Sequence, residues 1–471
     1  MRNFEFKKLS KYLDNILNKY KMYDSILAYS KLHFLKNHPE VNKEYFYNLS
    51  LETVTANNYP NLKRNIFKSI FNFFKRFLNE QPNFYYKKKY KKTDVLFFSH
   101  IININQLNNK NDFYYGDIQK QLKLFGFDSK IIIRNETSFA SKNLFQKLKR
   151  DKIILSDRTY FINELFYYLL SIFQFLNFNV YIKKFKLKDK KINFFSFKSF
   201  AYIAYNLKLN FQINLLIKKF RPKFIVITFE GHAWERLLIK NIKKTKTKII
   251  AYQFSSITKN HHGIFRSLGE EYDPDCIFTT GKRISSIFKK KYKCKVRVVG
   301  SNKWIKNKTY INNNNNKCIL ILTEGHIADC IKLINFGIEI SKLDEDLKLY
   351  LRIHPLIKNK HKINLDSYKN VEISNKSIEQ DFYRSSYFIY TGTASAVQAA
   401  AYGLNPIYYG SKNNLNTNPL FEVLRDEFYV TDPKQFIKII KKKNFKKNSR
   451  LRKYSREFFK RLKIKKNYFD I

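Results

Sequence analysis

Residues that interrupt regular structure are scarce in this chain of 471 residues, which has only 12 glycines and 9 prolines. This scarcity excludes a collagen-like or low-complexity protein. Hydrophobic residues make up 44% of the sequence, so there is enough apolar material for buried cores. A chain of this length exceeds one ordinary core, and we therefore expect two domains with extensions.

Cysteine is also rare, and its spacing excludes the common zinc and disulfide patterns. The chain has four cysteines, with no C-x-x-C pair among them: Cys276, Cys294, Cys318 and Cys330. We expect buried thiols in a reducing compartment. We find no cluster of carboxylates suited to Mg²⁺ in the sequence, so no metal and no resident cofactor are expected.

Acidic residues are few, since 38 Asp and Glu stand against 90 Lys and Arg, a net charge of +52. Such an excess suggests a nucleic acid or an anionic membrane as partner. An A/T-rich genome, however, enriches Lys, Asn, Ile, Phe and Tyr together without any polyanion. The lysines are spread along the chain and no nucleic-acid-binding module is recognisable, so no nucleic-acid partner is expected. A basic nucleic-acid or membrane binding protein remains the non-enzymatic alternative.

Long hydrophobic runs are limited to residues 165–182. The amino terminus has no apolar centre of the signal-peptide kind, so we expect a cytoplasmic protein. Gln174, Asn177 and Asn179 interrupt the run, and six lysines follow between 183 and 191. Two interpretations stay open: an aromatic helix on an anionic leaflet, which would place the protein peripherally at the inner face of the cytoplasmic membrane, or a buried helix followed by a solvated charge run.

Two stretches of alternating strands and helices indicate an α/β fold with two Rossmann-like domains facing a cleft. The predicted strands are 94–100, 130–134, 224–229, 248–254, 275–279, 296–299, 317–322, 347–353, 370–373, 388–390 and 406–409. The main predicted helices are 115–124, 235–243, 328–343 and 394–402. The predicted units are a helical extension (1–92), a first domain (93–311) with an aromatic and basic insertion at about 160–200, an asparagine linker (312–316), a second domain (317–440) and a basic C-terminal helix (441–471).

The second domain carries the sharper pattern. One strand ends on His354-Pro355, and another ends in the turn Thr391-Gly392-Thr393 before an alanine-rich helix that includes Ser395. Turn amides, the helix dipole and three hydroxyls together make an anion site. Each half alone also fits an ordinary strand end or helix cap. Both lie at carboxyl ends of strands, where open α/β sheets bind ligands, and this favours a site.

The first domain offers a carboxylate at a strand end, in Glu230-Gly231-His232. A matching tripeptide, Glu324-Gly325-His326, follows a strand of the second domain and suggests a duplication. Glu230 is our candidate catalytic base, and His232, which titrates near neutral pH, is its rival. Glu230 could instead only cap the next helix. Candidate acceptor-binding residues are Trp234, Glu235 and His100, although Glu235 also fits an ordinary helix-start acid.

These motifs, in this order, resemble those of GT-B glycosyltransferases, and more narrowly of bacterial sialyltransferases and related Kdo and capsule-polysaccharide transferases. The resemblance covers about residues 94–440. It implies a catalytic base at Glu230, contact of His354 with cytidine monophosphate, and phosphate binding by Thr391, Thr393 and Ser395. The acidic-acidic-Gly of those families is here Phe229-Glu230-Gly231, and their Ser-Ser pair is Thr391 to Ser395.

The chemistry of sugar transfer fits the same residues. An acceptor hydroxyl needs a base, and the leaving phosphate needs positive or hydrogen-bonding groups. Our prediction is an inverting, metal-independent glycosyltransferase that uses a CMP-activated sugar and acts on a glycan or lipid-linked glycan for capsule or lipopolysaccharide. The alternatives are a CDP-glycerol-type polymer transferase, a UDP-sugar transferase and an inactive binding module. The predicted donor-binding residues are Arg352, His354, Pro355, Thr391, Gly392, Thr393, Ser395, Glu324 and Gly325.

Overall fold

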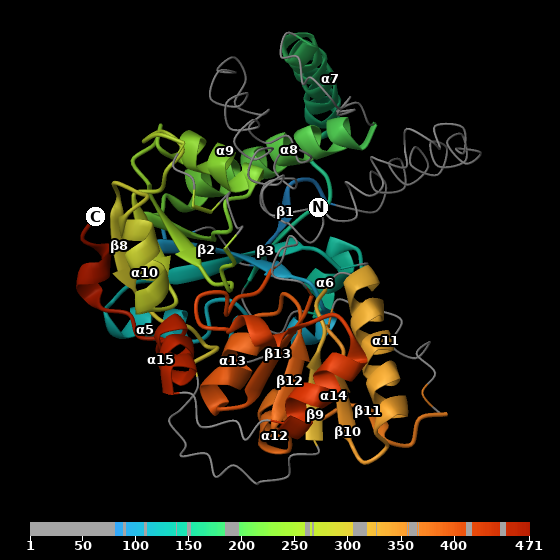
Figure 1. Ribbon diagram of the computed structural model, residues 1–471. Helices are drawn as coiled ribbons and strands as arrows, with labels where there is room; N and C mark the ends of the chain where they lie inside the picture. The colour runs from blue at the N-terminus through green and yellow to red at the C-terminus, as the bar shows by residue number, and fades with distance from the viewer. Residues whose placement is uncertain are drawn as a thin grey trace.

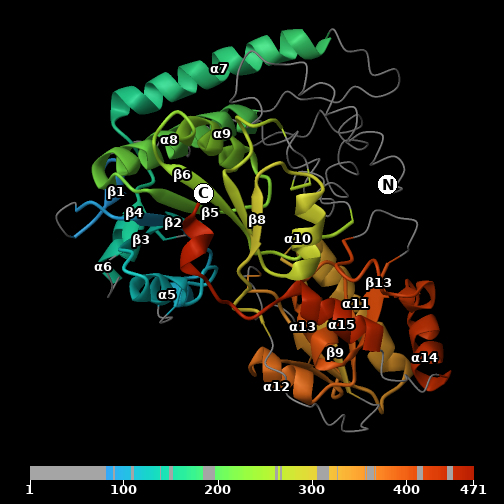
Figure 2. The ribbon, with the colours of Figure 1, turned by 90° about the vertical axis from the view of Figure 1, so that its left-hand side faces the viewer.

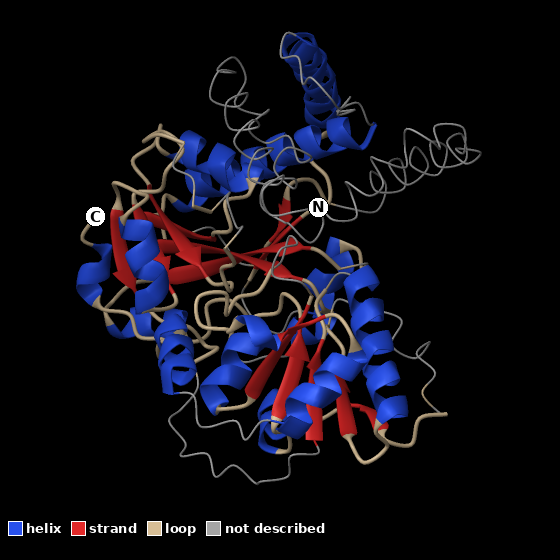
Figure 3. Cartoon of the chain, viewed as in Figure 1, coloured by secondary structure: helices blue, strands red, loops and turns tan. Residues whose placement is uncertain are grey.

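The computed structural model contains two β-sheets whose strands are mainly parallel, and each sheet lies between layers of helices (Figures 1 and 3). It describes residues 81–87, 91–107, 111–137, 139–147, 152–183, 197–259, 264–265, 268–304, 318–325, 327–355, 357, 365, 367–410, 417–442 and 449–471. The predicted extension before residue 81 and the asparagine linker lie outside these ranges.

The first sheet has eight strands in the order β1-β4-β3-β2-β5-β6-β7-β8. Every neighbouring pair is parallel except β1 with β4. β2 reads VLFFSHI and is buried along almost its whole length, as expected for a strand covered on both faces. The strands are β1 (Phe84–Tyr85), β2 (Val95–Ile101), β3 (Ser129–Asn135), β4 (Ile153–Leu155), β5 (Phe224–Thr228), β6 (Lys248–Gln253), β7 (Cys276–Thr279) and β8 (Lys295–Val298).

The second sheet has six strands, all parallel, in the order β11-β10-β9-β12-β13-β14. The central strand β9 pairs with β10 on one side and with β12 on the other. The strands are β9 (Cys318–Leu322), β10 (Lys348–Arg352), β11 (Val371–Ile373), β12 (Tyr387–Tyr390), β13 (Asn405–Tyr409) and β14 (Tyr429–Val430).

Both sheets contain the doubly wound order 3-2-1-4-5-6, counted from β2 in the first and from β9 in the second. The first sheet adds β1 at one edge and β8 at the other. The prediction of two Rossmann-like domains of GT-B type is thereby confirmed. In each sheet the chain first adds strands toward one edge, then returns to the centre and adds strands toward the other edge. The point of return, or switch point, lies between β2 and β5 in the first sheet and between β9 and β12 in the second. Ligands of open α/β sheets bind at such switch points.

The strand order also corrects the suggested duplication. The tripeptide at Glu230 follows β5, the fourth strand of its sheet, whereas the tripeptide at Glu324 follows β9, the first of its sheet. The two tripeptides are therefore not equivalent in topology. Each nevertheless follows a strand that borders a switch point.

Helices cover both faces of both sheets, and buried apolar clusters assign them to faces. On the first sheet, α8 (Phe197–Phe220), α9 (Ala233–Ile242) and α10 (Lys282–Lys289) cover one face, and α5 (Ile118–Leu124) and α6 (Ser141–Lys147) cover the other. On the second sheet, α12 (Ile378–Tyr383), α13 (Ser395–Tyr402) and α15 (Ser449–Phe458) oppose α11 (Ile327–Leu343) and α14 (Pro433–Lys442). Gly403 ends α13 with a positive φ of 102°, as its sequence position predicts.

The insertion after β4 forms two helices. α7 (Phe161–Lys183) packs on α8, and α8 packs on α9, so α7 is the outermost helix on this side of the sheet (Figure 2). The sequence patterns indicated α7 but not the long α8. None of the helices in the described ranges has the length and apolar character needed to cross a membrane.

The C-terminal segment differs from the predicted basic helix over 441–471. α15 ends at Phe458, and the following residues leave the helical conformation and return to the first domain. The Lys460 amide donates to the Thr280 carbonyl and the Lys463 amide to the Val299 carbonyl, so the end of the chain lies beside the first sheet (Figure 2). A helix could not make these bonds, because its amides are used within the helix.

Candidate functional site

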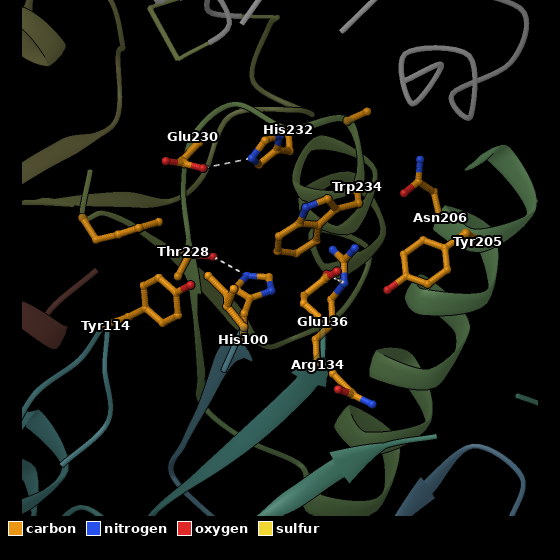
Figure 4. A pocket seen from close by; sticks show the side chains of 14 residues that line it. His100, Tyr114, Arg134, Glu136, Tyr205, Asn206, Thr228, Glu230, His232 and Trp234 are labelled. Carbon is orange, nitrogen blue, oxygen red and sulfur yellow. Dashed lines mark hydrogen bonds and ion pairs between the residues drawn. The ribbon is translucent and has the colours of Figure 1, made fainter. Parts of the chain in front are cut away.

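A cavity of about 480 Å³ opens at the switch point of the first sheet, at the carboxyl ends of β2, β3 and β5 (Figure 4). His100 of β2 and Thr228 of β5 meet there, with His100 Nε2 2.9 Å from Thr228 Oγ1. Burial lowers the pKa of His100 well below its ordinary value, and the positive charge of Arg134 lowers it further. His100, a predicted acceptor-binding residue, is therefore a neutral histidine in the cavity wall.

Glu230 and His232 lie next to each other at the mouth of this cavity. His232 Nε2 is 3.0 Å from Glu230 Oε2, and the two side chains are 22% and 21% exposed (Figure 4). Gly231 between them has φ 79°, a left-handed conformation that lets the chain turn from β5 into α9. Both residues line the cavity, so the two candidate bases form one pair that solvent and a substrate can reach.

Glu235 has a different position from the one predicted for an acceptor-binding residue. Its side chain is fully buried, and its carboxylate accepts the backbone N–H of Glu230 at 3.1 and 3.2 Å and that of His232 at 2.7 Å. Burial, and next the charge of Glu230, raise the pKa of Glu235 well above its ordinary value, while the two backbone bonds oppose this rise. Glu235 therefore stabilises the turn between β5 and α9 from its buried side. Because Glu235 occupies this capping position, the alternative that Glu230 only caps α9 has no support.

The cavity wall also contains residues that sequence reasoning missed. The Arg134 guanidinium lies 4.7 Å from the ring centre of Tyr205 and 5.9 Å from that of Trp234, and it forms an ion pair with Glu136. Trp234, predicted to bind the acceptor, is mostly buried and its ring lies 5.7 Å from that of His100. Arg134 is the penultimate residue of β3 and could have been found by the same strand-end rule that selected Glu230. Tyr205 belongs to α8, a helix that no pattern indicated.

Lys303 is a further residue that sequence reasoning did not select. Its ammonium lies 5.8 Å from the ring centre of Phe254, which lines the cavity, and 5.9 Å from that of Phe459. Burial lowers the pKa of Lys303 to about 8, and the nearby charge of Glu230 acts in the opposite direction. The Lys303 carbonyl accepts a hydrogen bond of 3.2 Å from Gln398 of α13. Lys303 thus connects the surroundings of Glu230 with the helix that begins at the hydroxyl-rich turn of the second domain.

The second switch point brings together Glu324 after β9 and the turn after β12. A Cβ atom on Gly392 would lie 2.5 Å from Glu324 Oε2 and 2.5 Å from Thr417 Oγ1. A side chain at position 392 would therefore displace the Glu324 carboxylate, which is 8% exposed. The neighbouring Gly325 ends this strand segment and is partly exposed.

Three hydroxyl side chains follow β12, and their environments differ. Thr391 is 9% exposed, and its buried Oγ1 has no hydrogen-bond partner among the described residues. Thr393 Oγ1 accepts the backbone N–H of Ser395 at 3.3 Å, which organises the first turn of α13. An unpartnered hydroxyl beside a helix N-terminus is suited to a bound anion.

The predicted donor-binding residues at the end of β10 lie in two different environments. Arg352, predicted to bind the donor, donates to Asp381 Oδ2 at 2.6 Å and to the Lys376 carbonyl at 2.8 Å. Asp381 is fully buried and also pairs with Arg384, so Arg352 is held in an ion-pair cluster beside α12. The His354 backbone N–H donates to Thr323 Oγ1 at 2.8 Å, which attaches it to the end of β9 next to Glu324. Pro355 is exposed.

No protein-family model matches the chain, and no curated protein matches it in sequence. Solved structures resemble it over most of its length. UDP-GlcNAc 2-epimerase from Neisseria meningitidis, bound to UDP-GlcNAc, is 12% identical, with a TM-score of 0.42 over 80% of this chain and 95% of that chain. Sucrose-phosphate synthase from Thermosynechococcus elongatus is 9% identical, with a TM-score of 0.45 over 78% and 95%. Since these scores are below 0.5, the fold assignment rests on the strand orders given above.

The arrangement supplies two kinds of chemistry at the two switch points. The first has a carboxylate and an imidazole in contact, which can remove a proton. The second has backbone amides, hydroxyls and a carboxylate, which can hold a phosphate and sugar hydroxyls. Within the described ranges, no group of three or more His, Cys, Asp or Glu side chains is placed to hold a metal ion.

Proposed function

We propose that the protein is a nucleotide-sugar-dependent glycosyltransferase that inverts the anomeric centre without a metal. The observation that carries the proposal is the position of Lys303, whose ammonium lies beside Phe254 of the cavity wall and whose carbonyl accepts a hydrogen bond from α13. Lys303 therefore links the surroundings of the proposed base with the helix that follows the proposed anion-binding turn. Transfer from a donor phosphate to an acceptor hydroxyl requires these two groups to be brought together.

In the proposed reaction, Glu230 takes the proton of the acceptor hydroxyl. The acceptor oxygen then bonds to the anomeric carbon as the bond from that carbon to the donor phosphate oxygen breaks, and the nucleotide leaves as an anion. His232, 3.0 Å from Glu230, orients the carboxylate and can pass the proton to solvent. The wall of Trp234, Arg134 and Tyr205 would receive the acceptor, because aromatic rings and a guanidinium offer stacking and hydrogen bonds to a sugar.

The donor would lie at the second switch point. The amides that open α13, with Thr391, Thr393 and Ser395, would bind its phosphate, and Glu324 would accept hydrogen bonds from ribose or sugar hydroxyls. The His354-Pro355 unit next to them supports a cytidine nucleotide, through the resemblance to sialyl- and Kdo transferases. We therefore propose a CMP-activated sugar as donor.

Lys303 would supply the positive charge that a metal supplies in other enzymes. A protonated lysine near the leaving phosphate would stabilise the leaving anion, and burial makes such a charge more effective than it is in water. We propose that the product belongs to a bacterial surface polysaccharide, such as capsule or lipopolysaccharide, and that the protein works peripherally at the inner membrane face on a glycan or lipid-linked glycan.

Isothermal titration calorimetry with CMP, CDP and UDP tests this proposal directly. We expect the full chain to bind CMP more tightly than UDP, and a Thr391→Val, Thr393→Val double variant to lose at least tenfold in affinity, since valine keeps the volume of each side chain but not its hydroxyl. Preference for UDP would overturn the donor assignment, preference for CDP would favour a CDP-glycerol-type transferase, and binding of no nucleotide would overturn the function.

A further inference from the structure

The polarity of α7 is the reverse of that of an ordinary surface helix. Three of its polar side chains face the protein: Glu164, Ser171 and Gln174 are each at most 7% exposed. The spacing of seven and then three residues places them on one side of the helix. In a water-exposed helix, residues at these positions would be apolar.

Large apolar side chains occupy the opposite side of α7. Those that form the outward stripe are 49% to 78% exposed and recur at spacings of three or four residues: Ile162, Leu165, Phe166, Leu169, Phe173 and Leu176. Among the α7 side chains that the structure describes, only Glu164 carries a charge, and it faces inward. Among the described side chains, the stripe therefore contains no charged residue.

Contacts on the inner side fix this orientation. The Glu164 carboxylate accepts the Thr159 backbone N–H at 2.7 Å and lies 3.7 Å from Lys208 Nζ of α8. The ring of Tyr167 lies 5.9 Å from that of Phe211, also of α8. A rotation of α7 that hid the apolar stripe would break these contacts and expose α8, so the outward stripe is the stable arrangement of this chain.

The geometry points to a lipid leaflet as the partner: we infer that α7 lies in the plane of an anionic membrane with its outward stripe among the acyl chains. Six lysines between 183 and 191 follow the helix directly, against one aspartate, and the whole chain carries +52. Cations at the end of an apolar helix complement acidic headgroups. At 1.5 Å per residue the helix is about 35 Å long, and it lies along the rim of the first domain (Figure 2). A long apolar stripe without charged side chains fits a bilayer surface better than a compact protein interface.

This inference adds a membrane-binding surface to the peripheral location proposed above. It rests on the proposed function only for the choice of membrane face. Vesicle co-sedimentation of the full chain tests it without any sugar donor. The vesicles contain phosphatidylglycerol and phosphatidylcholine in equal parts, with phosphatidylcholine alone as comparison. We expect binding to the anionic vesicles, weakened roughly tenfold or more in the Leu169→Glu, Phe173→Glu double variant, because each apolar side chain contributes to insertion.

Leu124→Glu is the matched control. Leu124 is 85% exposed at the end of α5, on the opposite face of the first sheet, so its replacement adds a charge at an exposed leucine but leaves α7 intact. We expect this control to bind vesicles like the unchanged chain. Unaltered binding of the double variant, or no binding of the unchanged chain, would overturn the inference.

A second copy of the chain is the competing occupant, and sedimentation velocity without lipid separates the two. A monomer supports the leaflet, whereas a dimer that the double variant abolishes would assign the stripe to self-association and overturn the inference. Calorimetry with CMP on the double variant shows whether the nucleotide site is intact, so failure of the membrane inference and failure of the proposed transferase are distinguishable.

Discussion

At the residue scale, Glu230 and His232 share one place in the proposed chemistry. They are 3.0 Å apart, and both reach the cavity at the first switch point. A carboxylate beside an imidazole can act as the base itself or can orient the imidazole to do so. If Glu230 is the base, replacing Glu230 removes the proton acceptor. If His232 is the base, replacing His232 removes it.

We expect Glu230→Gln to lower turnover by roughly 10²–10⁴ while donor affinity changes no more than a few-fold, since glutamine keeps the shape but cannot accept the proton. Steady-state kinetics and CMP titration measure the two quantities. His232→Ala is the comparison and should cost less. Near-normal turnover of Glu230→Gln together with an inactive His232→Ala would give the role of base to the histidine.

Lys303 predicts a pH dependence with opposite signs for activity and stability. Its pKa is lowered to about 8 from the ordinary 10.5. We expect kcat/KM to fall as the pH rises through about 8, because the free enzyme loses the charge that stabilises the leaving phosphate. Between about pH 8 and 10.5 the unfolded chain keeps this proton and the folded chain does not, so this group's contribution to folding stability rises with pH.

Rate profiles of the unchanged chain and of Lys303→Arg from pH 6 to 10 check the assignment. Arginine stays protonated over this range, so its profile should remain level where that of the lysine enzyme falls. Lys303→Met, which is similar in length but uncharged, should be slow at every pH. Identical profiles for the lysine and arginine enzymes would mean that the group titrating near pH 8 is not Lys303.

At the element scale, the turn between β5 and α9 depends on a carboxylate beneath it. Glu235 is fully buried and binds the amides of Glu230 and His232. Its contribution is positional, because it belongs to the wall beneath the turn and does not line the cavity. Sequence reasoning assigned it to the acceptor because a helix-start acid looks the same whether its side chain points toward the cavity or beneath the backbone.

We expect Glu235→Ala to lose about 2–4 kcal/mol of unfolding free energy, since it leaves two amides without partners, and to lower turnover by roughly 10–100-fold with nucleotide affinity unchanged. Glu235→Gln retains one acceptor oxygen and should recover much of both. Urea unfolding and steady-state kinetics provide the measurements. If the glutamine variant is folded as stably as the unchanged chain but remains inactive, Glu235 acts in the chemistry itself.

At the scale of the whole molecule, the end of the chain joins the two domains. α15 covers the second sheet together with α13, and the residues after it return to the first sheet. Phe469, two residues before the C-terminus, packs against Phe127, Phe224 and Phe278 at ring distances of 5.3, 5.0 and 6.0 Å. The first domain is therefore completed by residues that follow the second domain in sequence.

We expect Phe469→Ala to destabilise the first domain by about 3–5 kcal/mol, because it empties a buried aromatic site. Phe139→Ala, at a ring that is 43% exposed, is the control and should change stability by less than about 1 kcal/mol. Urea unfolding followed by circular dichroism compares them. Equal stabilities of the two variants would show that the C-terminal residues contribute nothing to the first domain.

The sequence by itself determined the α/β class and most of the strands, because continuous apolar runs and their polar ends are local properties of the chain. It also placed Glu230, His354 and Thr391 at strand ends, where the structure has them. Only the tertiary structure decided which strands are neighbours, and hence that His100 meets Thr228 and that Glu324 lies beside Gly392.

Three further features depended on contacts between distant parts of the chain: the inward position of Glu235, the link of Lys303 to α13, and the side of α7 that faces solvent. Local patterns state that a residue is apolar or charged and which helix face it occupies. They do not state what that face meets, because burial is settled when separate elements pack together.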